Sequence, residues 1–99
     1  MEVRTKSFQL VEPGSEESRF VVDPSGFLFV ELARSDREFS APFSQLDFEQ
    51  DLAGHTRVRC VTADPKLNWQ LTMQDEDAGY LLSLIGNVEE QLESLLQPA

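Results

Sequence analysis

The sequence predicts an α+β fold, in which a bent antiparallel sheet of about six strands is closed by one long C-terminal helix. Two observations favour this class. Short segments of strand-like composition, separated by turn residues, fill the chain as far as residue 73. A helical apolar period then begins after residue 75. We therefore expect a single domain over residues 1–99, with a β-rich body (1–73) and a C-terminal amphipathic helix (75–97).

Turn residues divide the first half of the chain into strands. Pro24 presets φ for a turn and Gly26 tolerates positive φ, so the apolar runs on either side of them form the clearest hairpin in the sequence. Pro42 confines its own strand to an edge, a bulge or an end of the sheet. The strands expected in this half are residues 1–11, 19–22, 27–32 and 38–43.

The run from Phe27 to Val30 is apolar at every position. Because successive side chains of a strand point to opposite faces, both faces of this strand are apolar. Such a strand is expected to be central, with one face under the helix and the other under a second layer or a partner. One helix covers only one face of this strand. A second copy of the chain would cover the other face, so the run is also compatible with a homodimer.

The second half of the chain carries weaker and stronger strand signals. Residues 44–52 fit either alternation or a helical turn, and we favour a strand followed by a loop. The segments 56–63 and 68–73 alternate more clearly. The apolar face of the second of these consists of Trp69, Leu71 and Met73.

The apolar residues of the C-terminal segment recur at spacings of 4, 3, 4 and 3, which predicts an amphipathic helix. Asp75 and the two acids after it complement the positive end of the helix dipole. Gly86 lies inside this helix and is unfavourable by about 1 kcal/mol relative to alanine. The regularly spaced residues are Leu81, Ile85, Val88, Leu92 and Leu95.

The strand faces and the helix stripe together predict the hydrophobic core. Each member is an apolar residue on the expected inner face of its element. The predicted core consists of Phe20, Val22, Phe29, Val30, Val58, Cys60, Trp69, Leu71, Leu81, Ile85 and Val88.

The order of strands followed by one C-terminal helix resembles the pleckstrin-homology architecture, a bent antiparallel sheet closed by one helix. The resemblance lies in topology, and two features depart from the family. Its characteristic tryptophan sits in the final helix, whereas Trp69 precedes the helix here. The first hairpin loop of its lipid-binding members is basic, whereas residues 12–18 carry three acids. The resemblance therefore implies the fold but not phosphoinositide binding.

Charge excludes several classes of partner. Eight Lys and Arg stand against 18 Asp and Glu, a net charge of −10. Nucleic acids and anionic membranes both require clustered basic residues, so we expect neither as a partner. No apolar run is long enough for a transmembrane helix, and no secretory signal opens the chain. A single cysteine is compatible with a reducing compartment, so we expect a cytoplasmic protein.

Catalytic and metal-binding motifs are weak. His55 and Cys60 are the only residues of their types, but Cys60 shares a strand face with Val58, which favours a buried structural thiol over a nucleophile. Acids alternate over residues 47–51 as at the start of a calcium loop, but Leu52 stands where that loop needs glycine. Glycine-rich phosphate-binding motifs are absent. We therefore expect no enzymatic activity, no metal and no cofactor.

The helix and the acidity remain as the informative features. The apolar stripe packs against the domain's own sheet, against a partner, or against both. We favour a non-catalytic protein-binding module, such as an adaptor, assembly factor or chaperone-like protein. It would dock a partner's basic surface or apolar groove through an exposed sheet edge or through the helix. The predicted binding residues are Leu92, Leu95 and Leu96, with Glu89, Glu90 and Glu93 as an acidic rim.

An acidic inhibitor or immunity protein that blocks a basic partner surface is the alternative. The net charge of −10 and the absence of any Lys or Arg after Lys66 favour it. Binding of this kind depends steeply on salt concentration, because it is largely electrostatic.

Overall fold

The computed structural model describes residues 3–12 and 16–96, and for residues 92–96 it describes the backbone only. Seven strands form one antiparallel sheet in the order β4-β3-β2-β1-β7-β6-β5, and a single α-helix follows them. The predicted α+β fold is confirmed, with seven strands in place of about six. The elements are β1 (Arg4–Glu12), β2 (Glu17–Asp23), β3 (Phe27–Leu32), β4 (Arg37–Pro42), β5 (Leu46–Gln50), β6 (His55–Cys60), β7 (Trp69–Gln74) and α1 (Asp75–Leu96).

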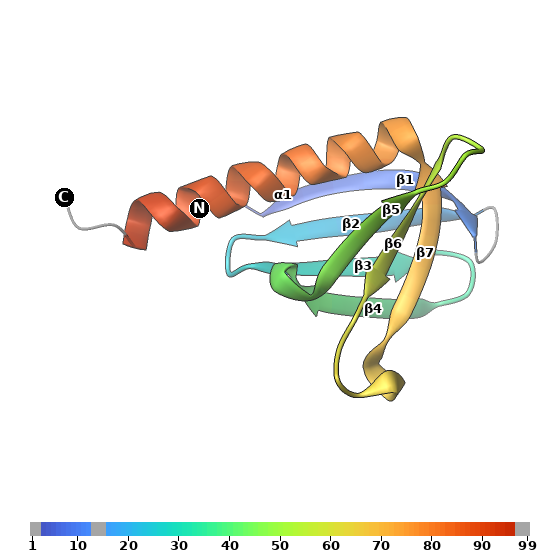
Figure 1. Ribbon diagram of the computed structural model, residues 1–99, viewed down its shortest axis with the longest axis horizontal. Coiled ribbons are helices and arrows are strands. Elements are labelled where there is room, and N and C mark those ends of the chain that lie inside the picture. Colours follow the sequence, from blue (N-terminus) through green and yellow to red (C-terminus); the bar gives the residue numbers. More distant parts are fainter. Residues whose placement is uncertain (1–2, 13–15, 97–99) are drawn as a thin grey trace.

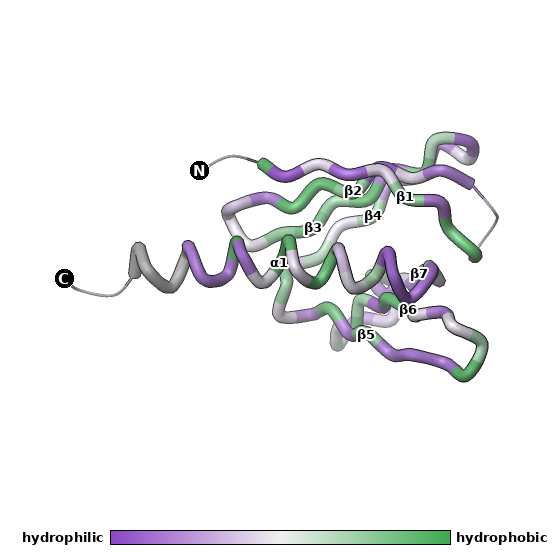
Figure 2. Tube along the Cα trace, turned by 90° about the horizontal axis from the view of Figure 1, so that it is seen from above, coloured by the Kyte–Doolittle hydropathy of each residue, from purple (hydrophilic) through white to green (hydrophobic). Residues whose placement is uncertain are grey.

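The sheet is strongly bent. Strands β1–β4 run side by side, and β5–β7 cross them steeply (Figure 1). The two halves join where β1 pairs with β7, and the register shifts there between Leu10 and Glu12. A β-bulge of this kind increases the local twist, which accommodates the bend. Seen from above, α1 lies between the two halves and closes the roll (Figure 2), in contact with β2, β6 and β7.

Local sequence explains most element boundaries. Gly26 has a φ of 98°, which favours glycine, and its N–H donates to the Asp23 carbonyl at 3.0 Å to close the predicted β2–β3 hairpin. The ambiguous segment 44–52 becomes the end of a 3-10 turn (Phe43–Gln45) and then β5 (Leu46–Gln50), as favoured. The helix ends at Leu96, and residue 97, where its end was predicted, lies outside the described residues.

The core lies between the inner face of the sheet and α1. Nine of the eleven predicted core residues are buried, and Trp69 is partly buried against them. Phe29 was predicted wrongly, since its side chain is 40 % exposed. Alternation along β3 turns Leu28, Val30 and Leu32 inward, which leaves Phe27 and Phe29 on the outer face. The run is apolar on both faces, so its composition cannot indicate which face is buried.

No helix within the described residues is long and apolar enough to cross a membrane.

Candidate functional site

The predicted binding residues lie at the far end of α1. Figure 1 shows this end of the helix running past the sheet. Glu89 and Glu90 are exposed there. The side chains of the remaining four predicted residues, Leu92, Glu93, Leu95 and Leu96, lie outside the described part of the chain. Their role in binding therefore stays a prediction.

Strand β4 forms one edge of the sheet, and this edge is partly closed. Its register with β3 makes Phe39 and Ala41 the hydrogen-bonded partners, so the backbone groups of Glu38, Ser40 and Pro42 point to the edge. The indole N–H of Trp69 donates to the Ser40 carbonyl oxygen at 3.1 Å. Pro42 has no N–H to offer. Two of the edge-facing groups of β4, the Ser40 carbonyl and the position of the missing Pro42 N–H, are therefore closed to an incoming strand.

Strand β5 forms the opposite edge, and it is open. The N–H of Asp51 donates to the His55 carbonyl, and the N–H of Val61 donates to the Gln45 carbonyl, both at 2.9 Å. Odd-numbered residues of this segment are therefore the ones bonded to β6. The backbone N–H and C=O groups of the even-numbered Phe48 and Gln50 consequently point away from β6, toward the free edge.

A hollow of about 380 Å³ lies between this open edge and the start of α1. Leu82 projects from the helix beside it and is 46 % exposed. Gly79 leaves room in the helix wall, because a Cβ at this position would meet no atom within 4 Å. We call this hollow the β5–α1 groove. It is lined by Phe48, Gln50, Thr56, Asp75, Ala78, Gly79 and Leu82.

One acid, Asp75, lines the groove. Asp75 accepts a 2.7 Å hydrogen bond from the Thr56 hydroxyl, which ties the start of the helix to β6. Asp51 accepts hydrogen bonds from the backbone N–H groups of His55 and Ala53, and these lower the pKa of its carboxyl group. Asp47 and Glu49 lie on the opposite face of β5 from Phe48 and Gln50, where they hold Arg59.

The structure separates the two residues considered for nucleophilic catalysis. His55 begins β6 and Cys60 ends it, so about 17 Å of extended chain lies between them. Burial raises the pKa of the Cys60 thiol, which disfavours the reactive thiolate. Among the described residues, no group of three or more His, Cys, Asp or Glu side chains is arranged to hold a metal ion.

The burial of Cys60 has a direct chemical consequence. We expect its thiol to react with Ellman's reagent at least about tenfold more slowly in the folded protein than in concentrated guanidinium chloride. The rate is measured from the absorbance of the thionitrobenzoate anion that the reagent releases as it reacts with the thiol. Equal rates in the two conditions would contradict the buried position of Cys60.

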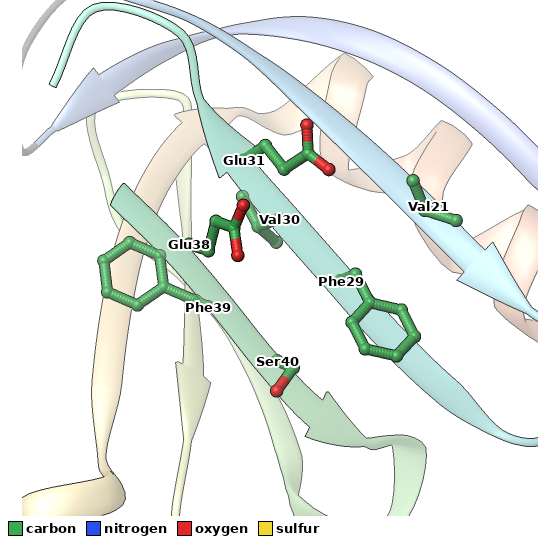
Figure 3. Close-up of a pocket in the computed structure, with 7 residues that line it drawn as sticks. All are labelled: Val21, Phe29, Val30, Glu31, Glu38, Phe39 and Ser40. Carbon is green, nitrogen blue, oxygen red and sulfur yellow. The ribbon is translucent and has the colours of Figure 1, made fainter. Parts of the chain in front are cut away.

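A second hollow, of about 420 Å³, lies on the outer face of the sheet over β2, β3 and β4 (Figure 3). We call it the outer-face hollow. The Phe29 ring borders it and stacks on Phe27 with a centroid separation of 6.2 Å, and both rings are 40 % exposed. Among the described residues no second layer covers this face. The lining residues are Val21, Phe29, Val30, Glu31, Glu38, Phe39 and Ser40.

Sequence reasoning found one of these surfaces and missed the other. The apolar run 27–30 indicated that its second face needs a cover. The β5–α1 groove was not anticipated, because its two walls come from distant parts of the chain. Leu82, which widens the apolar stripe of the helix, was the only local signal for it.

No family model, curated protein or solved structure matches this chain. The likeness to the pleckstrin-homology architecture therefore remains one of element order.

Proposed function

We propose that this protein is a non-catalytic protein-binding module that adds an extended segment of its partner to the free edge of β5, beside α1. The observation that carries the proposal is the open edge of β5 next to an apolar hollow. In such β-augmentation, backbone hydrogen bonds supply affinity and neighbouring pockets select side chains. The partial closure of the β4 edge by Trp69 and Pro42 favours β5 as the docking edge.

The groove also indicates what the partner segment looks like. Its apolar wall, Phe48 and Leu82, suits an apolar side chain. Gly79, Leu82, Gly86 and Glu90 follow one another at intervals of three or four residues, so they share one side of α1. The exposed Glu90 thus continues the groove side of the helix with negative charge. We therefore propose an extended segment that combines apolar residues with Lys or Arg, in a cytoplasmic partner.

Two glycines of α1 provide a test with a matched control. Gly79 lines the groove, whereas Gly86 lies on the same side of the helix beyond it. A Cβ at either position meets no atom within 4 Å, and both changes remove a glycine from a helix interior, which stabilises the fold by roughly 0.5–1 kcal/mol. Linear peptides selected by wild-type protein from a displayed random library are expected to bind Gly79→Leu at least about tenfold more weakly. Gly86→Leu is expected to bind them unchanged.

Affinities are measured by calorimetry, and hydrogen exchange is followed with and without peptide. Addition of a strand to β5 slows amide exchange at Phe48 and Gln50, because their N–H groups become hydrogen-bonded. Peptides that bind Gly79→Leu as well as the wild type, or that leave these two amides unprotected, would contradict the proposal. A library that yields no binding peptide would also count against it.

An acidic inhibitor that blocks a basic surface is the second candidate. The excess of acids over bases on the outer face of the sheet favours it. The two candidates differ in salt dependence, since inhibition by charge weakens steeply as ionic strength rises, whereas strand addition with apolar contacts persists.

A further inference from the structure

The outer-face hollow contains two carboxylates that oppose each other. The strand register pairs Arg19 with Glu31, and Glu31 in turn with Glu38. The Arg19 guanidinium binds both Glu31 oxygens, at 2.9 and 2.8 Å. Glu38 has no ionic or hydrogen-bonding partner among the described residues. Like charges directly opposite each other in a sheet are unfavourable, and the row Arg19–Glu31–Glu38 has no cation beside Glu38.

The neighbouring cation in the sequence does not fill this position. Arg37 precedes Glu38 in β4, and adjacent residues of a strand point to opposite faces. Its guanidinium lies over the Phe39 ring, 5.0 Å from the centroid. Glu38 therefore faces the outer-face hollow without a cation from its own strand.

An aromatic surface lies beside the unpaired acid. Phe29 pairs with Ser40 in the row next to the Glu31–Glu38 pair, and its ring is exposed. Figure 3 shows Phe29 and Glu38 on the same side of adjacent strands. A ring face and a carboxylate in this arrangement suit a flat cation, which stacks on the ring and donates to the acid.

We infer that the outer-face hollow binds an arginine side chain of a protein partner, with the guanidinium between Phe29 and Glu38. Arginine fits better than lysine, because its planar group combines stacking with paired N–H donation to a carboxylate. The molecule uses each of these contacts elsewhere, since Arg19 binds both oxygens of Glu31 and Arg37 covers Phe39.

Charge argues for a basic partner over a second copy of this chain. The outer face of β2 and β3 carries Glu17, Asp23 and Glu31 with Arg19 as the single base, and Glu38 of β4 adds a further acid. Hydrogen bonds from the Ser25 hydroxyl and N–H lower the pKa of Asp23, which keeps it ionised. Two copies, each with a net charge of −10, would bring like charges together at this face. The inference does not rest on strand addition at β5, because the two surfaces share no residue.

The test uses a blocked arginine, which presents the side chain as a protein does. ¹⁵N-labelled protein is titrated with N-acetyl-arginine-N-methylamide, and with the same derivative of citrulline, its neutral analogue of similar shape. We expect saturable shifts of the Phe29, Glu38 and Ser40 amides with arginine, and about tenfold weaker binding of citrulline, because a charge-assisted hydrogen bond is lost.

Two variants test whether Glu38 is the acid that binds the arginine side chain. Glu38→Gln is expected to weaken arginine binding by about tenfold, since it removes the unpaired charge. Glu12→Gln removes an exposed acid of β1 that lines neither proposed surface, and it is expected to leave the affinity unchanged. Both variants are expected to fold, because the replaced side chains are exposed. An amide spectrum that is unchanged outside the hollow verifies this.

Several results would overturn the inference. Equal binding of citrulline, shifts confined to other residues, or no saturable shift would remove the arginine site. Tighter binding of spermidine than of blocked arginine at the same amides would reassign the hollow to a small polyamine. Shifts of Phe27 and Phe29 that depend on protein concentration without ligand would reassign it to a second copy.

Discussion

Replacement of Phe20 with alanine is expected to lower the free energy of unfolding by about 3–5 kcal/mol. Phe20 lies at the centre of the core with no exposed surface. Its ring meets the Phe8 ring edge to face, with the centroids 5.3 Å apart. Alanine removes this contact and leaves a cavity that the surrounding strands fill only in part. Small domains have total stabilities of roughly 5–15 kcal/mol, so the loss is large.

Phe29→Ala is the matched control for this change. Phe29 lies on the adjacent strand, where it pairs with Val21, the residue next to Phe20. Its side chain is exposed on the outer face, so the same substitution is expected to change stability by about 1 kcal/mol or less. Urea denaturation followed by tryptophan fluorescence measures both variants. Equal losses would show that the two faces of β3 have been assigned wrongly.

Leu81→Ala is expected to destabilise the protein by about 2–5 kcal/mol. Leu81 is fully buried and belongs to the helix stripe that packs on the sheet. The contacts of α1 with β2, β6 and β7 hold the two halves of the bent sheet together. A cavity beneath the helix therefore weakens both halves at once. Thermal and urea denaturation, followed by circular dichroism, measure the change.

Leu82→Ala is the control for Leu81, since the two leucines are adjacent in the same helix. Leu82 is half exposed and lines the β5–α1 groove. We expect a change in stability of about 0.5 kcal/mol or less, together with weaker binding of the selected peptides. A large loss of stability in Leu82→Ala would mean that Leu82 is a core residue, and the groove would lose one wall.

The two proposed surfaces have different chemistry. The β5–α1 groove combines free backbone groups with an apolar wall, and it suits an extended chain. The outer-face hollow combines an exposed ring with an unpaired acid, and it suits a single cationic side chain. A basic partner can satisfy both, because acids lie near each of them.

The sequence by itself determined the class of the fold, most of its elements and the sign of its charge. These properties follow from local patterns: the turn at Pro24 and Gly26 separates two strands, and the spacing of Leu81, Ile85 and Val88 defines the buried side of the helix. Most of the core was predictable for the same reason, because alternation and helical spacing identify one inner face per element.

The tertiary structure decided which face of β3 is buried, which edge is open and which acids meet. Phe29 lies outside because the buried inner face of β3 holds Leu28 and Val30, a choice that a run apolar on both faces leaves open. Trp69 occupies the Ser40 carbonyl at the β4 edge from 29 residues away along the chain. Glu31 faces Glu38 only through the β3–β4 register. Each of these depends on contacts between segments distant in sequence, which local periodicity does not encode.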